Sequence, residues 1–142
     1  MVRAGKAGAG RRPTENASRR VLVVEDDEDT RKMLVTALSD AGYIPVAALD
    51  GKHALRTALA IEPGAIVLDL MLPELSGEEF AREYHAHRET TQAPIVVVSA
   101  KRDGAQVARD IGARAFLPKP LDLDQLVARI DATVQPSASA RG

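Results

Sequence analysis

Three carboxylates, a serine and a lysine of this 142-residue chain stand at the ends of short apolar runs. Glu25 and Asp26 follow the first run, Asp69 ends the third, Ser99 ends the fourth, and Lys119 comes just after the fifth. Carboxylates a few ångströms apart repel one another, so that either their pKa values rise or a cation binds between them. If the runs converge, these residue types therefore predict a cation site.

A hard divalent cation would satisfy three carboxylates. Mg²⁺ prefers oxygen ligands, keeps several waters, and is usually held by one or two carboxylates together with phosphate oxygens. We expect Asp26 and Asp69 to bind Mg²⁺ directly and Glu25 to bind it through water. The main-chain carbonyl of Met71 is a further candidate ligand.

The same group of residues could bind and accept a phosphoryl group. Lys119 could pair with Asp69 and then with a phosphoryl oxygen, because an ammonium forms strong hydrogen bonds to both. The hydroxyl of Ser99 could donate to another phosphoryl oxygen. Asp69 would then be a carboxylate nucleophile that forms an acyl phosphate.

Each residue also has a structural interpretation. The acidic run 25–29 could be the solvated start of a helix, where the dipole favours negative charge. Asp69 could be a cap or turn residue, Ser99 a hydrogen-bonding residue at a strand end, and Lys119 a surface lysine. Their joint placement at four strand ends favours a common site.

Five apolar runs are the predicted strands, because they are short and most are rich in Val and Ile. They cover residues 21–24, 44–48, 65–70, 94–98 and 113–117. The first, third and fourth are apolar on both alternating faces, which is typical of buried parallel strands.

Five amphipathic stretches follow the strands and are the predicted helices. They cover residues 30–41, 51–60, 77–87, 103–111 and 122–134. In the first helix Met33, Leu34, Ala37, Leu38 and Ala41 share one face. Ser76 with Glu79 forms a capping box before the third helix, and Asp122 caps the last.

Strands that alternate with helices predict an α/β fold with a parallel sheet. Right-handed crossovers leave few strand orders, and for five βα units we expect a flavodoxin-like, doubly wound sheet in the order 2-1-3-4-5. Ligands of such sheets bind beyond the carboxyl ends of the strands where the order reverses. Strands one and three are then neighbours, which brings Glu25, Asp26 and Asp69 into one pocket.

The predicted domain covers residues 20–134, between a disordered basic arm (1–19) and a disordered tail (135–142). Residues 1–20 hold six basic residues and one acid, whereas residues 21–142 hold 13 basic and 19 acidic residues. An acidic domain with 3% aromatic residues in the chain is not expected to bind nucleic acid directly.

The chain contains no cysteine, which excludes disulfides, thiolate metal sites and cysteine nucleophiles. No apolar run is long enough to cross a membrane, and the N-terminal residues lack the apolar core of a signal peptide. These observations predict a cytoplasmic protein without a membrane partner.

Four motifs of the chain resemble those of the response-regulator receiver family over about residues 20–134. They are Val23-Val24-Glu25-Asp26-Asp27, Val67-Leu68-Asp69-Leu70-Met71-Leu72-Pro73 with Gly77, Val98-Ser99-Ala100, and Lys119-Pro120. The resemblance implies a two-component signalling switch that is phosphorylated on Asp69. The phosphoryl donor would be a sensor histidine kinase or a histidine phosphotransfer protein, and Mg²⁺ would be the cofactor, with Mn²⁺ as a substitute.

The resemblance also implies roles for individual residues. Ser99, the backbone N–H of Ala100, and Lys119 would bind the phosphoryl group. Ser99 and Phe116 would form the conformational switch, in which the ring turns inward as the serine moves toward the phosphate. The Lys119–Pro120 peptide bond is expected to be cis.

The chain departs from the winged-helix transcriptional class of this family. Receivers of that class carry acidic residues where this chain has Arg114 and Ala115, so Arg129 lacks the partners of their active dimer. A monomer and a phosphorylation-dependent dimer both remain open. Output is expected through contact with an unknown downstream protein, on the face of the fourth and fifth helices and the strand between them.

Three other functions compete with a regulatory switch. Phosphatases of the haloacid dehalogenase type need a second Asp two residues after the nucleophile, where this chain has Met71. A flavin or nucleotide binder needs a Gly- or Ser/Thr-rich phosphate loop, where this chain has the acidic run 25–29. A scaffold that binds partners without phosphorylation stays open. We expect a non-enzymatic domain with at most slow self-dephosphorylation.

Overall fold

Five parallel strands form one sheet in the computed structural model, which describes residues 19–87, 89 and 92–134. The strands are β1 (Arg20–Val24), β2 (Ile44–Ala48), β3 (Ala65–Asp69), β4 (Ile95–Ser99) and β5 (Ala115–Pro118). Their order is β2-β1-β3-β4-β5, with every neighbouring pair parallel. The predicted flavodoxin-like order is therefore confirmed.

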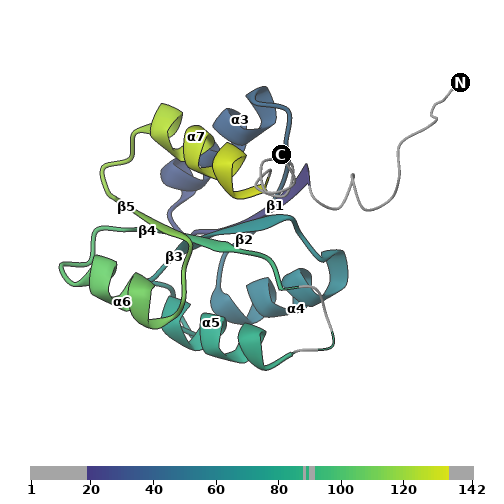
Figure 1. Ribbon diagram of the computed structural model, residues 1–142, viewed down its shortest axis with the longest axis vertical. Helices are drawn as coiled ribbons and strands as arrows, with labels where there is room; N and C mark the ends of the chain where they lie inside the picture. The colour runs from purple at the N-terminus through teal and green to yellow at the C-terminus, as the bar shows by residue number, and fades with distance from the viewer. Residues whose placement is uncertain (1–18, 88, 90–91, 135–142) are drawn as a thin grey trace, which may run out of the picture.

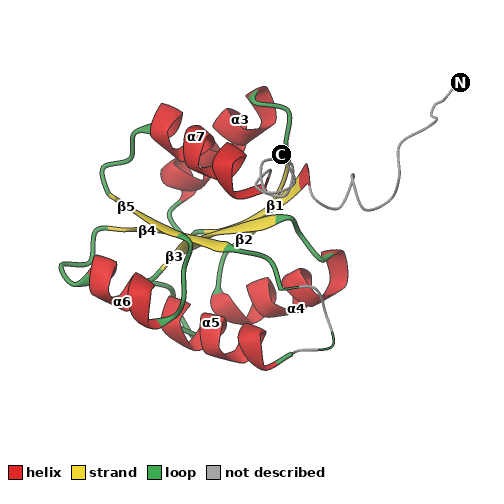
Figure 2. Ribbon diagram, in the orientation of Figure 1, coloured by secondary structure: helices red, strands yellow, loops and turns green. Residues whose placement is uncertain are grey.

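Helices cover both faces of the sheet, as Figures 1 and 2 show. They are α3 (Glu28–Asp40), α4 (Gly51–Ile61), α5 (Gly77–Ala86), α6 (Gly104–Asp110) and α7 (Leu123–Val134). Helices α3 and α7 lie on one face, and α4, α5 and α6 lie on the other (Figure 1). None of the helices in the described part of the chain combines the length and apolar character that a membrane span requires.

The core has two layers because successive strand residues point to opposite faces. Val21 and Val23 of β1 pack with residues of α3 and α7, whereas Leu22 and Val24 pack toward α4 and α5. Both faces of the central strands are thus buried, as the continuous apolar runs predicted. Three of the buried polar residues, Glu25, Asp69 and Ser99, lie at or directly after the carboxyl ends of strands.

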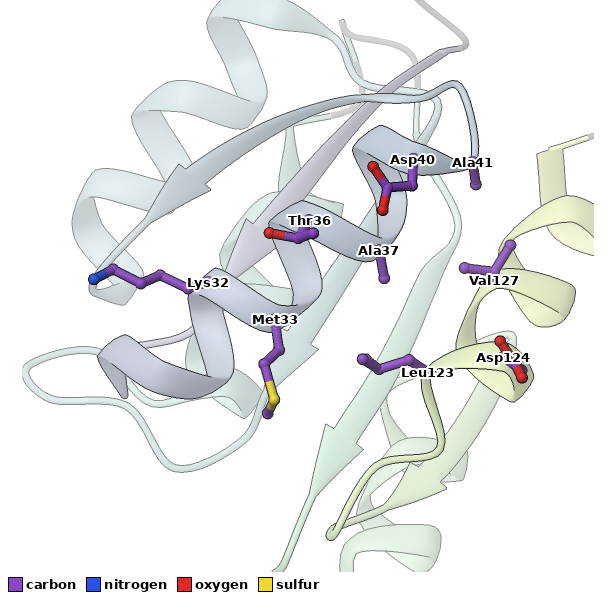
Figure 3. A pocket seen from close by; sticks show the side chains of 9 residues that line it. All are labelled: Lys32, Met33, Thr36, Ala37, Asp40, Ala41, Leu123, Asp124 and Val127. Atoms are coloured by element: carbon purple, nitrogen blue, oxygen red, sulfur yellow. The ribbon is translucent and has the colours of Figure 1, made fainter.

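Burial is uneven along the apolar face of helix α3. Leu34 and Leu38 are fully buried, but Met33, which was expected on the same face, is 49% exposed. Met33 borders an open groove of about 650 Å³ between α3 and α7, because the two helices do not close over it (Figure 3). The groove is lined by Lys32, Met33, Thr36, Ala37, Asp40, Ala41, Leu123, Asp124 and Val127, none of which is a candidate site residue.

Helix ends agree with the predicted capping residues. Ser76 and Glu79 form the reciprocal capping box of α5, and the Oδ1 atom of Asp122 accepts a hydrogen bond from the Gln125 N–H. Helix α3 begins two residues earlier than expected because Asp27, inside the acidic run, is its N-cap. Acidic residues are favoured at a helix start, but the sequence does not show which of these adjacent acids is the N-cap.

Strand β5 begins two residues later than predicted. The N–H of Ala113 donates to the carbonyl of Ala108 at 2.9 Å, so this residue still belongs to the turn that ends α6. Gly112 enters that turn with a φ of +75°, a conformation that glycine adopts without strain. The predicted arm and tail lie outside the described residues, apart from Arg19.

Candidate functional site

The three predicted carboxylates meet at the carboxyl edge of the sheet. One carboxylate oxygen from each of Glu25, Asp26 and Asp69 lies within 4.8 Å of the other two. Strands β1 and β3 are direct neighbours, with Val24 opposite Leu68, so the residues that follow them leave the sheet side by side. The strand order thus brings together groups that are about 40 residues apart in the sequence.

Asp69 is the last residue of β3, and only 4% of it is exposed. Its Oδ1 accepts a hydrogen bond of 3.1 Å from the Met71 N–H, which orients the carboxylate. The start of α5 packs tightly behind it, since a Cβ atom on Gly77 would lie 2.7 Å from the Asp69 carbonyl oxygen. Glycine at position 77 is therefore required by this close approach.

Glu25 is the most deeply buried acid of the site, with 1% exposure, whereas Asp26 is exposed. The Oε2 atom of Glu25 accepts from the Asp27 N–H at 3.1 Å, and its own N–H donates to the Ala48 carbonyl at 3.1 Å. Burial raises the pKa of the Glu25 carboxyl, and the charge of Asp69 raises this pKa further. Hydrogen bonds from Lys119 and Asp27 oppose that rise without cancelling it.

Lys119 joins two of the carboxylates. Its Nζ donates to Glu25 Oε1 at 2.8 Å and to Asp69 Oδ2 at 3.2 Å. Burial lowers the pKa of Lys119, but the hydrogen bond to Glu25 and the charge of Asp69 outweigh burial, so the pKa is raised. The sequence indicated Asp69 as a partner and missed Glu25, which lies 94 residues away with no local signal to link them. The Lys119–Pro120 peptide bond is cis.

The carboxylate oxygens of this group suit a small hard cation. One ammonium stands against three carboxylates, and the oxygens are the ligand type that Mg²⁺ prefers. Asp26 is open to solvent, so a hydrated ion can reach the group. Met71, the predicted carbonyl ligand, lies directly beside it, with 60% of the residue exposed.

Ser99 ends β4 on the neighbouring side of Asp69 and is 1% exposed. Its hydroxyl oxygen accepts a hydrogen bond from the Lys101 N–H at 3.1 Å, which leaves the hydroxyl proton for another acceptor. The carbonyl of Ser99 accepts from the Lys119 N–H at 3.0 Å. The loop that contains Ala100 is therefore attached to the residue that carries the site's ammonium.

Phe116 on β5 lies against the start of α6 and is half-buried. A Cβ atom on Gly104 would lie 2.7 Å from Cε1 of the Phe116 ring and 3.7 Å from Cβ of Ser99. Gly104, the first residue of α6, therefore lies close to both the Phe116 ring and the predicted switch serine. Either a core role or a switch role for Phe116 is compatible with this packing.

The acidic run 25–29 divides into separate tasks. Glu25 and Asp26 belong to the carboxylate group, Asp27 caps α3, and Glu28 and Asp29 lie in the first turn of that helix. The helix-start interpretation is thus confirmed for residues 27–29, and the role of Glu25 and Asp26 as metal ligands stays a prediction. The division falls between Asp26 and Asp27, where the chain turns from the strand end into the helix.

A family model confirms the resemblance noted from the motifs. The model of the response regulator receiver domain matches residues 21–131. The chain is 37% identical over 118 residues to the response regulator MprA of Mycolicibacterium vanbaalenii, a match that covers 82% of this chain and 50% of that protein. It is 38% identical to the MprA protein of Mycobacterium ulcerans over the same shares. The chain spans about half the length of these curated relatives.

Solved structures have the same fold. The chemotaxis protein CheY4 of Vibrio cholerae aligns with a TM-score of 0.73 and 28% identity, covering 80% of this chain and 97% of that one. A putative response regulator from Chloroflexus aurantiacus aligns with a TM-score of 0.75 and 29% identity, covering 81% and 96%. The similarity covers nearly the whole of each of these two proteins.

Proposed function

This chain belongs to the response regulator receiver domain family, and from that premise we propose that it is a phosphorylation-dependent switch with Asp69 as phosphoacceptor. Receiver domains are the regulatory modules of two-component systems. The proposed donor is the phosphohistidine of a sensor kinase or of a histidine phosphotransfer protein. The chain spans about half the length of its curated relatives. Any activity of a longer protein that contains this domain is therefore also a proposal.

One observation carries the proposal. The nearly buried carboxylate of Asp69 is held by a backbone N–H, faces the Lys119 ammonium at 3.2 Å, and lies within 4.8 Å of two further acids. A carboxylate that served only as a cap would not need a half-buried lysine and two acidic neighbours. The arrangement suits a carboxylate that attacks a negatively charged phosphoryl group.

The proposed reaction is an in-line transfer. An oxygen of Asp69 attacks phosphorus, an O–P bond forms, and the N–P bond of the phosphohistidine breaks, with its electron pair returning to the imidazole ring. Mg²⁺, held by Asp26 and Asp69 with Glu25 and Met71 as further ligands, would neutralise charge on the transferred group. Mn²⁺ is expected to replace it.

The chain's own residues bind the product. Lys119 is within reach of a phosphoryl group on Asp69 and would stabilise its charge. The free proton of the Ser99 hydroxyl and the N–H of Ala100 would donate to phosphoryl oxygens. The product is then an acyl phosphate surrounded by donors on two strand ends.

Signal output follows if the phosphoryl group binds one conformation better than another. Movement of Ser99 toward the phosphate would change the space beside Phe116, since both border the first residue of α6. The proposed output surface comprises α6, β5 and α7, and the proposed readers are proteins. Oligomeric state and cytoplasmic location stay predictions.

Two alternatives make different demands on the site. A phosphatase would need an acid/base group near Asp69, but position 71 holds an apolar side chain. A scaffold that works without phosphorylation would not need the ion pair of Lys119 with two carboxylates. We therefore favour a switch whose acyl phosphate hydrolyses slowly.

Intact mass spectrometry tests the proposal directly. The protein is incubated with acetyl phosphate and Mg²⁺, and the expected product carries one added phosphoryl group. The Asp69→Asn variant, which keeps the size of the side chain, is expected to gain none. A wild-type protein without added mass would support the scaffold, and free phosphate released over many turnovers would support the phosphatase.

A further inference from the structure

Arg31, in the first turns of α3, contacts the loop that carries the acidic pair. Its Nη1 donates to the carbonyl of Glu25 at 3.3 Å and to the carbonyl of Asp26 at 3.2 Å. Its backbone N–H donates to the carbonyl of Asp27 at 2.9 Å. One residue is therefore a hydrogen-bond partner of three consecutive carbonyls, those of residues 25–27.

These carbonyls set the direction of the carboxylates. The loop has only three residues between the end of β1 and the start of α3. A change in the backbone dihedral angles of Glu25 and Asp26 would move these two carbonyls and redirect the side chains relative to Asp69. A donor shared by both carbonyls opposes that rotation, in the way that outer-shell groups orient metal ligands.

We propose that Arg31 is a positioning residue for Mg²⁺ binding, one that holds the Glu25–Asp26 backbone in the geometry that brings both carboxylates to Asp69. This inference rests on the proposed magnesium site. Arg31 directs its guanidinium to carbonyl oxygens, and no ion pair within the described parts of the chain involves it. Its contribution is therefore through backbone geometry.

The sign of the effect separates positioning from simple electrostatics. Arg31 brings a positive charge close to a cation site, and by Coulomb's law alone its removal would strengthen Mg²⁺ binding. If Arg31 positions the ligands, its removal weakens binding instead. Lys32 is the matched control, since its side chain is 70% exposed and its ion pair joins Glu28, at 3.1 Å, outside the carboxylate group.

The test is calorimetric titration of the full chain with MgCl₂. Arg31→Met keeps the length of the side chain but has no donor, and we expect its Kd to rise about tenfold. Arg31→Lys keeps one charged nitrogen and is expected to recover most of the affinity. Lys32→Met is expected to bind as wild type or slightly more tightly. If Arg31→Met and Lys32→Met bind Mg²⁺ with the same Kd, the proposal is overturned.

Folding is monitored separately. Far-UV circular dichroism establishes that each variant is folded at the titration temperature, and the rise in thermal midpoint with Mg²⁺ gives a second readout of affinity. If Arg31→Met does not fold, Arg31→Gln, whose amide ends short of the carbonyls, takes its place with the same expectation. A wild-type protein that binds no Mg²⁺ would contradict the proposed function, whereas equal binding by wild type and variant contradicts only the role of Arg31.

Discussion

Charge balance dominates the site at the scale of single residues. Lys119 offsets part of the charge of Glu25 and Asp69, both of which are nearly buried. Each of these groups depends on the others, because a buried charge without a partner is costly. The lysine is therefore both a structural counter-ion and the proposed ligand of the phosphoryl group.

Replacing Lys119 by Met is expected to have opposite effects on two measurements. Mg²⁺ should bind more tightly by calorimetry, because the competing ammonium at 2.8 Å from Glu25 is gone. Phosphorylation by acetyl phosphate should become much slower, because the product loses a charged donor. Stability without Mg²⁺ should fall by about 1–3 kcal/mol in urea unfolding, since two carboxylates lose their partner.

The matched control for this prediction is the double variant Lys119→Met with Glu25→Gln. Neutralising the more buried acid should restore part of the lost stability, because it removes the unpaired charge. If the double variant is less stable than Lys119→Met alone, the ion pair does not account for the loss.

At the scale of elements, two glycines let helices approach the strand ends. Gly77 places the start of α5 against the backbone of Asp69, and Gly104 places the start of α6 against the ring of Phe116. Helix starts are thus in direct contact with the groups that are proposed to react and to move. Helix position and site geometry are consequently linked.

Gly77→Ala is expected to disturb the site as well as the fold. Its Cβ would meet the Asp69 carbonyl and the Leu70 Cα at 2.7 Å, and backbone atoms cannot move aside cheaply. We expect a loss of about 1–3 kcal/mol of stability, together with slower phosphorylation, measured by urea unfolding and intact mass. Gly112→Ala is the control, because nothing lies within 4 Å and only its φ of +75° is strained. That variant should lose about 1 kcal/mol and keep its phosphorylation rate.

Gly104→Ala tests the packing of Phe116. The new Cβ would lie 2.7 Å from the ring edge, so we expect a loss of about 1–3 kcal/mol in urea unfolding. Phe116→Leu removes that ring edge. The loss of stability in the double variant should therefore be smaller than the sum of the losses in the two single variants. Strict additivity would show that the contact does not determine the cost.

At the scale of the whole molecule, one hydrogen bond joins distant parts of the chain. The Tyr43 hydroxyl, between α3 and β2, donates to Asp131 of α7, and Arg19 stacks over its ring at 5.6 Å from the centroid. Burial raises the pKa of Tyr43 above its usual value, and the hydrogen bond and charge of Asp131 raise it further. The folded protein therefore keeps a proton that the unfolded chain loses near pH 10.

The consequence is a loss of stability in alkali. A tyrosine with a raised folded-state pKa contributes its full stability below about pH 10 and loses it progressively as the pH rises further. Tyr43→Phe should therefore be less stable than wild type at pH 8, by about 1 kcal/mol, and should lose stability less steeply above pH 10. Urea unfolding from pH 8 to pH 11 measures both. Parallel curves for the two proteins would contradict this role of Tyr43.

The fold and the location of the site could be predicted because they depend on local periodicity and one topological rule. Short continuous apolar runs and helical stripes are set by neighbours in the chain, and strand order then brings Glu25, Asp26 and Asp69 together. The exposure of Met33 does not follow from its helical stripe, because the stripe does not show how closely a second helix approaches. The bounds of the arm and tail stay predictions.

The sequence by itself determined the element order, the parallel sheet, the capping residues Ser76 and Asp122, and the family. Only the tertiary structure decided that Lys119 pairs with Glu25, that Arg31 bridges two carbonyls, and that Gly77 touches the backbone of Asp69. These contacts depend on separations of about 3 Å between atoms on different elements or across a short loop. Periodicity leaves such distances open, and the packing of the completed sheet and its helices sets them.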